Sequence, residues 1–315
     1  MQQYILRRLL LMIPTLFVIT IFTFGLLRIM PGDFIVAQMA EARGADLEQM
    51  ALWRAELGLD EPAYKQYFTW VSGLIVGDWG TSYWRNEPVT QVIREALPIS
   101  FELGVLSIIV AVVISLPVGI ISAIKQDTWI DYLGRTISIT GISIPNFFLA
   151  LLVIIYGSKW FNWFPPQTYQ NPLENPMGNL EQFIPGAFVL GAALSTQNMR
   201  MLRTTMLETL RADYVRTARA KGLKEWSVIY RHAFRNALIP VVTLLGLQVT
   251  VAIGGSVIIE TVMNMNGIGR NYIMAVSQRD YPLVQGILLV LVSATLLTNL
   301  MVDLSYSWLD PRIRY

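Results

Sequence analysis

Long apolar runs alternate with polar segments along most of the chain. The runs cover, approximately, residues 9–27, 98–124, 136–160, 183–193 with a polar extension to 199, 238–259 and 283–302. About 20 apolar residues are needed to cross the ~30 Å hydrocarbon core of a bilayer. The pattern therefore predicts an all-α integral membrane protein with six transmembrane helices.

The first apolar run has two readings. It follows Arg7 and Arg8 and contains Pro14. A secretory signal peptide is one reading, but the run is longer than the usual apolar region of about 7–15 residues. The nearest cleavage-like triplet, Ala40-Glu41-Ala42, also lies far past its end. We expect an uncleaved first helix in residues 1–30, with a kink or a re-entry at Pro14.

The polar segment that follows is acidic. Residues 31–97 carry ten acidic and five basic side chains, a net charge of −5. Within it, apolar residues recur at helical spacing: Tyr64, Tyr67, Phe68, Trp70, Val71 and Leu74. This spacing indicates an amphipathic helix that lies on the membrane or on the protein. We expect residues 31–95 to form an external segment.

The basic residues gather elsewhere, and they orient the chain. Residues 200–236 carry nine basic and three acidic side chains, a net charge of +6. Positively charged loops stay on the cytoplasmic side of a membrane. This rule places both termini and residues 125–135 and 200–236 in the cytoplasm. The connections 31–97, 161–182 and 260–282 then lie outside.

The composition supports a membrane protein and excludes several kinds of site. Hydrophobic residues make up 54% of the chain, charged residues only 15%, and the mean hydropathy is +0.47. The chain has no Cys, and His232 is its one His. Disulfides, thiolate sites and multi-histidine zinc sites are therefore excluded. We expect His232 to be a structural or interface residue rather than a catalytic one.

Two other function classes find little support. An intramembrane enzyme needs a paired nucleophile and base, or metal ligands, within its spans. An ion-coupled carrier is typically marked by midplane charges and inverted repeats, and neither is visible in this sequence. The phosphate-binding pattern G-x-x-x-x-G-K-[ST] is also missing. If transport is driven by ATP, we expect the ATPase to be a separate chain.

The basic stretch from Asp213 to Pro240 combines charge with helical periodicity. Apolar residues recur at steps of three or four before Gly222, and again after it from Trp226 onward. This pattern predicts two helices, with Gly222 as the left-handed residue that ends the first. A plain cytoplasmic loop that only satisfies the charge rule is an alternative. A DNA-binding helix-turn-helix is disfavoured between two membrane spans.

The segments Asp213–Gly222 (DYVRTARAKG) and Arg231–Pro240 (RHAFRNALIP) resemble the cytoplasmic EAA loop of importer-type ABC permeases, in the form found in the dipeptide/oligopeptide/nickel branch. The Glu-Ala-Ala positions of the general motif read Arg216-Thr217-Ala218 here, which is typical of the peptide branch. Further pieces match in the family's order: MPGD at 30–33, LGLDEP at 57–62, GDWGTS at 77–82, GISIP at 141–145, GIGR at 267–270, RDYP at 279–282 and DPR at 310–312. The resemblance covers nearly the whole chain and is closest to the B-type subunit.

The resemblance implies a type I ABC importer permease, with the permease domain at 96–310 and a coupling loop at about 200–240. It implies that this loop docks in a cleft of an ATP-binding subunit. The coupling residues would be Tyr214, Arg216, Thr217, Ala218, Arg219, Ala220, Lys221, Gly222, Leu223, Lys224 and Glu225. ATP and Mg²⁺ would be bound by the partner subunits, with no cofactor and no metal in this chain.

The same resemblance implies the partners and the location. The partners would be a homologous second permease in a heterodimer, two ATP-binding subunits, an extracytoplasmic solute-binding protein and membrane lipid, with no nucleic acid. The chain would lie in a bacterial or archaeal cytoplasmic (inner) membrane. Its solute would be a di- or oligopeptide, with an oligosaccharide or nickel as the alternative.

A few residues within the spans have two readings each. Ser143 and Pro145 form a functional hinge or a plain proline kink. Glu102 contacts solute in the pathway or is a hydrated interfacial residue. Glu260 and Asp303 fit helix-end or network residues better than ligands.

Overall fold

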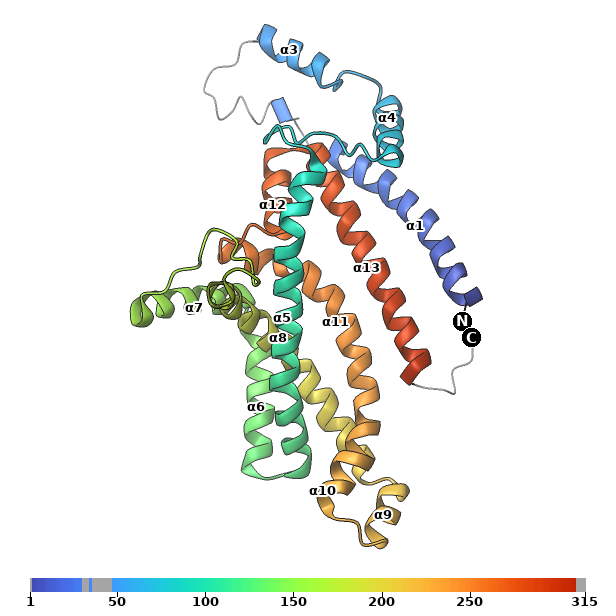
Figure 1. Ribbon diagram of the computed structural model, residues 1–315, viewed down its shortest axis with the longest axis vertical. Helices are drawn as coiled ribbons and strands as arrows, with labels where there is room; N and C mark the ends of the chain where they lie inside the picture. Colours follow the sequence, from blue (N-terminus) through green and yellow to red (C-terminus); the bar gives the residue numbers. More distant parts are fainter. Residues whose placement is uncertain (1, 30–33, 36–46, 310–315) are drawn as a thin grey trace. The chain divides into compact units, whose positions relative to one another are not determined.

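The computed structural model of the chain describes residues 2–29, 34–35 and 47–309 (Figure 1). Its regular secondary structure is helical, with one isolated β-bridge between Thr81 and Pro88. The motifs at 30–33 and 310–312 lie outside the described residues. The chain forms two compact units: residues up to 99 with 267–297, and residues 100–266 with 298 onward.

The first unit contains α1 (Gln2–Ile29), α3 (Leu47–Glu56), α4 (Ala63–Val76), the start of α5 (Val89–Ile124), α12 (Ile268–Gln278) and most of α13 (Tyr281–Leu309). Its apolar core joins α5, α12 and α13 through Val89, Ile268 and Ile287, each almost completely buried. A Cβ at Gly286 of α13 would lie 2.5 Å from Val89, so a larger residue would push the helices apart.

The predicted amphipathic helix forms as α4, and one of its faces packs on α1. The ring of Tyr67 lies 5.3 Å from that of Phe24, and the Tyr67 and Thr20 hydroxyl oxygens are 2.9 Å apart. Tyr64 and Phe68 remain about two-thirds exposed on another face. The sequence predicted that this helix lies on the membrane or on the protein. The structure shows that the face with Tyr67 lies on the protein.

The second unit is built around one long helix. It contains the rest of α5, then α6 (Trp129–Ser143), α7 (Asn146–Phe161), α8 (Pro176–Leu210), α9 (Asp213–Ala220), α10 (Glu225–Ser227), the π-helix η1 (Val228–Phe234) and α11 (Arg235–Val262). Helix α8 packs against α6, α7, α11 and η1. Small residues allow close approach, as expected: a Cβ on Gly191 would lie 2.5 Å from the Ser107 carbonyl oxygen of α5.

Four described helices are long and apolar enough to cross a membrane. They are Ile5–Ile29, Val89–Ile124, Glu225–Ile253 and Tyr281–Leu304. The pair Trp129–Gly141 and Asn146–Phe161 is apolar enough as well, but its two parts are bent by 99°. Counting this pair as one broken span gives up to five.

The predicted fourth span, residues 183–199, lies in α8, which is not among these candidates. Its polar residues Asn179, Gln182 and Asn198 are buried inside the second unit. A helix surrounded by protein can carry polar groups that lipid would not accept. The all-helical prediction is confirmed, whereas hydropathy alone does not identify a span here.

Three predicted connections contain helical residues. The predicted loop 125–135 is mostly helix, because α6 begins at Trp129. The predicted connection 161–182 ends early, because Asn175 caps α8 by accepting a hydrogen bond from the Gly178 amide. The predicted connection 260–282 contains α12, an amphipathic helix that buries Ile268 and Ala275.

Candidate functional site

The candidate site is the segment from Asp213 to Glu225, which contains α9 and the following turn (Figure 1). Helix α8 ends at Leu210, and Ala212 is extended, with ψ of 148°. The apolar residues before Gly222 therefore lie in a separate short helix, α9. This break lets α9 fold back against the unit instead of extending α8.

Helix α9 is anchored by one buried face. Val215 is fully buried, and Ala218, three residues later, is 6% exposed. Both belong to an apolar cluster with Leu202 and Met206 of α8 and with buried residues of η1 and α11. Residues three apart lie on the same side of a helix. The segment is thus attached through Val215 and Ala218, and its other side chains remain outside.

The turn after α9 has the predicted conformation. Gly222 has φ of +73°, and its amide donates a hydrogen bond to the Arg219 carbonyl over 2.9 Å. Arg219 also binds the Glu225 carboxylate across the turn at 2.7 Å. Both side chains are largely exposed, so this ion pair is worth roughly 0.2–1 kcal/mol. The left-handed backbone at Gly222 contributes more to the sharp reversal than the pair does.

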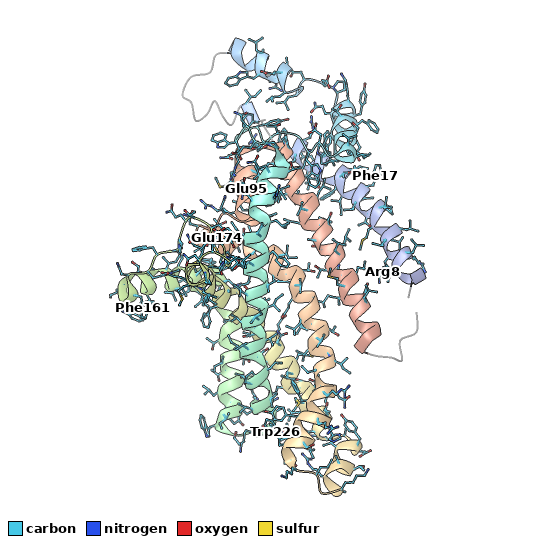
Figure 2. All side chains as sticks on the ribbon, viewed as in Figure 1. Arg8, Phe17, Glu95, Phe161, Glu174 and Trp226 are labelled. Carbon is cyan, nitrogen blue, oxygen red and sulfur yellow. The ribbon has the colours of Figure 1, made fainter. Side chains whose placement is uncertain are left out.

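The outer surface of the segment is apolar and basic. Tyr214 and Leu223 are exposed by 45% and 42%, and Trp226 by 69% (Figure 2). The remaining predicted coupling residues are also exposed, except Ala218: Arg216, Thr217, Arg219, Ala220, Lys221, Gly222, Lys224 and Glu225. Exposed large apolar groups among cations suit contact with another protein.

Two contacts hold this surface in place. The Asn236 amide donates a hydrogen bond to the Tyr214 hydroxyl oxygen at 3.0 Å, which joins α9 to the start of α11. The rings of Trp226 and Tyr230 lie 3.8 Å apart. The second predicted helix therefore forms, and it continues into α11.

That second helix is wound differently from the expected α-helix. Residues Val228–Phe234 form a π-helix between α10 and α11. Val228, Ile229 and Ala233 are buried in it, while His232 is half-buried. Short π-helical stretches are rare and often occur at functional sites.

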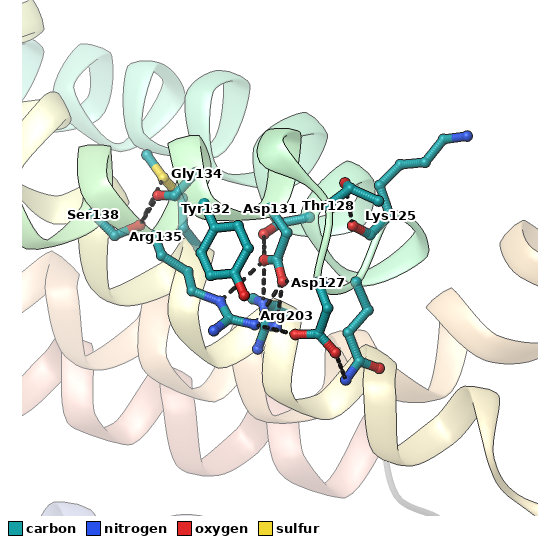
Figure 3. A network of polar contacts seen from close by, with 12 residues as sticks. Lys125, Asp127, Thr128, Asp131, Tyr132, Gly134, Arg135, Ser138 and Arg203 are labelled. Carbon is teal, nitrogen blue, oxygen red and sulfur yellow. Dashed lines mark hydrogen bonds and ion pairs between the residues drawn. The ribbon is translucent and has the colours of Figure 1, made fainter.

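A polar cluster centred on the buried Asp131 lies in the same unit. We define it as Ser122, Asp127, Asp131, Arg135 and Arg203 (Figure 3). Asp131 has a completely buried side chain and accepts two hydrogen bonds from Arg203, each 2.7 Å long. Arg135 donates to it at 2.6 Å, and Ser122 and the Asp127 amide donate as well.

The polar cluster joins α5, α6 and α8, and it extends toward the coupling segment. Asp127, in the turn between α5 and α6, binds Arg135 at 3.2 Å and Gln126 at 3.0 Å. Gln126 in turn accepts a hydrogen bond from Arg211, just before α9, at 3.1 Å. Sequence reasoning did not single out this cluster. The spacing of Asp131 and Arg135 by four residues was the available signal for a helical ion pair.

The carboxylate of Glu102 has a hydrogen-bond partner in the connection between α7 and α8. The Tyr169 hydroxyl donates a hydrogen bond to its carboxylate at 3.1 Å. Burial, and then the Glu102 charge, raise the pKa of Tyr169. The surrounding connection is fixed to α8 by Gln182, which donates to the carbonyl oxygens of Pro166 and Thr168.

Ser143 and Pro145 lie at the break between α6 and α7. Ser143 ends α6, and the Ile144 amide still donates to the Thr140 carbonyl at 3.2 Å. Pro145 is extended, with ψ of 135°, and precedes the first residue of α7. The interruption is therefore a change of helix direction rather than a kink inside one helix.

These residues form an exposed apolar and basic surface that is attached to the long helices of the second unit. Among the residues that the structure describes, no three His, Asp or Glu side chains are grouped as metal ligands.

Comparison with known proteins agrees with the observed helices. Residues 115–315 match the family described as "Binding-protein-dependent transport system inner membrane component", and residues 1–104 match the N-terminal family of the same membrane components.

Relatives match over the whole chain. The dipeptide transport system permease protein DppB of Alkalihalophilus pseudofirmus is 39% identical, with 100% of each chain covered. The glutathione transport system permease protein GsiC of Pectobacterium atrosepticum is 37% identical, again with 100% of each chain covered.

A solved structure of the methionine ABC transporter MetNI, in inward-facing conformations, has a similar fold. It is 15% identical with a TM-score of 0.57, and the match covers 70% of this chain and 97% of that one.

Proposed function

Because the chain belongs to the family of binding-protein-dependent transport system inner membrane components, we propose that it is the permease through which short peptides enter the cell. The family consists of transport subunits that are not themselves catalytic. Relatives named for dipeptide and glutathione transport support peptides as the solute class. Oligosaccharide and nickel remain the alternatives from the sequence.

The proposal includes the partners. A component of this family works with an ATPase and a binding protein. More specifically, we infer a heterodimer with a homologous permease, two ATP-binding subunits and one solute-binding protein. We also infer six spans with both termini in the cytoplasm, with α8 as the span that hydropathy does not identify.

The observation that carries the coupling role is the exposed apolar and basic surface of Asp213–Glu225. Val215 and Ala218 attach this segment to α8 and α11, so a push on Tyr214 or Leu223 is transmitted to the long helices. We propose that the segment inserts in a cleft of an ATP-binding subunit. Its apolar groups would be buried there, and its charges would set the register at the rim.

Substitution of Gly222 tests this role. A Cβ at Gly222 would have nothing within 4 Å, so a side chain there acts through the backbone. Proline cannot adopt φ of +73° and would also lose the amide hydrogen bond to Arg219. We expect Gly222→Pro to insert normally but to abolish peptide uptake and binding-protein-stimulated ATPase activity in reconstituted vesicles.

Two further variants sharpen the experiment. Asn tolerates the left-handed region, so Gly222→Asn should keep most of the uptake, whereas Gly222→Val should lose it. Gly77 is a matched control, because it has φ of +87° and also has nothing within 4 Å of a Cβ. Gly77→Val should strain the chain equally and leave coupling intact. Normal coupled uptake by Gly222→Pro would overturn the coupling role.

A further inference from the structure

A cavity in the first unit has features that the coupling role does not use. Its volume is about 400 Å³, within the usual range for small-ligand pockets. It lies among α1, α4, the connections at 55–61 and 79–83, and the start of α13. Aromatic side chains form much of its wall: Phe24, Trp70, Trp79, Tyr83 and Tyr281.

Several hydrogen-bond donors in the lining lack an acceptor. The indole N–H of Trp70 is buried and has no hydrogen-bond partner among the residues that the structure describes. Gln285 is only 6% exposed, and its amide makes no hydrogen bond to the described residues. The Tyr83 hydroxyl has none either, and burial raises its pKa to about 12, so it remains a donor at neutral pH. Buried polar groups are normally paired, so unpaired donors that line a cavity are available to hydrogen-bond a ligand.

The charges of the lining describe that ligand further. Arg28 of α1 donates to the side-chain oxygen of Gln66 and, within the described part of the chain, has no carboxylate partner. Glu61 is already paired with Lys65 at 2.5 Å, but Glu56 has no ion pair to a described residue. The cavity lining therefore contains several hydrogen-bond donors, the cationic side chain of Arg28 and the separate carboxylate of Glu56. This combination fits a zwitterion with an anionic oxygen group at Arg28 and an amine near Glu56.

We propose that this cavity binds a short peptide, with the peptide's terminal carboxylate on Arg28, Trp70 and Gln285. Most of its lining comes from the connections between spans, which favours a water-soluble ligand over a lipid headgroup. The aromatic wall would contact the peptide side chains. The choice of a peptide as the ligand rests on the proposed transport function. The arrangement of donors around the cavity is independent of that function.

Binding to the full-length chain in nanodiscs tests the proposal. The probe is the dipeptide alanyl-phenylalanine, titrated by calorimetry in phosphatidylcholine discs. We expect saturable binding that weakens about tenfold or more when the peptide carboxylate is amidated, because a charged hydrogen bond is lost. We expect Arg28→Ala to weaken the binding of the free peptide by a similar factor.

Gln285→Leu separates binding from folding. It removes a buried amide that makes no hydrogen bond, so thermal stability should stay the same or rise while peptide affinity falls several-fold. Trp70→Phe removes the N–H donor together with part of the ring, so peptide affinity should fall as well, and its thermal stability is measured in parallel. Gln278→Leu in α12 is the matched control, because Gln278 lies outside the cavity lining, and it should leave affinity unchanged.

Three outcomes would overturn the proposal: no saturable binding, equal binding of the amidated peptide, or unchanged affinity in Gln285→Leu and Trp70→Phe. Binding of phosphatidylethanolamine that Arg28→Ala weakens, with no peptide binding in phosphatidylcholine discs, would identify a lipid site and also overturn the proposal. ATP-driven uptake is measured separately with the complete transporter. A failed binding test with normal uptake would refute the cavity site alone.

Discussion

At the scale of single residues, Asp131 is a charged side chain of the second unit that several partners bind at once. It is completely buried, yet it is bound by two guanidinium groups and a hydroxyl. A buried ion pair contributes little net stability compared with an apolar substitute, but breaking one by removing a partner is costly. Its value here is geometric, because it fixes the ends of α5, α6 and α8 in one arrangement.

We therefore predict that Asp131→Asn destabilises the protein. The change removes the negative charge that faces Arg203 and Arg135. Loss of one partner from a buried pair costs about 3–5 kcal/mol, and the partial exposure of Arg135 places the expected value at the lower end. The apparent melting temperature in detergent should fall by several degrees.

An exposed pair provides the control for Asp131. Asp213 binds Arg216 at 3.4 Å, with side chains exposed by 95% and 72%. Asp213→Asn should leave the melting temperature almost unchanged, since exposed pairs contribute little. Equal effects of the two substitutions would mean that the polar cluster does not hold the three helices together.

At the scale of elements, the break between α6 and α7 raises the question of what maintains it. Pro145 cannot donate the next helical hydrogen bond, which favours a break. The surrounding packing favours the same geometry. A Cβ at Gly141 would lie 2.5 Å from the Thr196 side chain, and α7 packs against α8 and α11. We infer that packing is sufficient and that Pro145 mainly restricts the unfolded chain.

This inference predicts a mild effect of Pro145→Ala. Stability should fall by about 0.4–1 kcal/mol, the usual contribution of a compatible proline. The angle between the two helices should persist. Because the chain has no native Cys, spin labels can be attached to cysteines that replace Trp129 and Phe161, which are exposed by 74% and 78% at the far ends of α6 and α7.

The distance between the two labels decides the question. An unchanged distance in Pro145→Ala supports packing as the determinant. A clearly longer distance would mean that the helices straighten without the proline, and Ser143–Pro145 would then be better described as a hinge.

At the scale of the whole molecule, the six-span arrangement makes a direct prediction about accessibility. Lys224 and Glu174 are both exposed. In the cysteine-free background, Lys224→Cys should react with a membrane-impermeant thiol reagent only in inverted vesicles. Glu174→Cys should react only in intact cells or spheroplasts.

Labelling of both cysteines from the same side would contradict the arrangement. With α8 as a true span, the segments before and after it must lie on opposite sides. Without α8 as a span, Glu174 and Lys224 would share one side. The labelling of each cysteine is compared with its labelling after detergent solubilisation, where the reagent reaches both sides of the protein.

The sequence was sufficient for the features that depend on local patterns. Apolar runs identified most of α1, α5 and α13, and the charge-rich stretch around Gly222 predicted its left-handed turn. Short-range patterns also explain the errors. Asp131 looked like part of a polar loop, because its partner Arg203 is 72 residues away in the chain. Likewise, no local signal connects Arg28 with Gln285, which line the same cavity although they lie far apart in the chain.

The buried polar face of α8 also has a consequence for how the protein is made. A nascent helix that carries Gln182, Ser195, Thr196 and Asn198 partitions into lipid less well by itself than the apolar spans do, because polar side chains make insertion less favourable. Helices α6 and α7 are synthesised before α8, but α11, which provides Gln248 for Asn198, comes after it. We therefore expect α8 to remain near the translocon until α11 emerges, so that the two helices enter the bilayer as one folding unit.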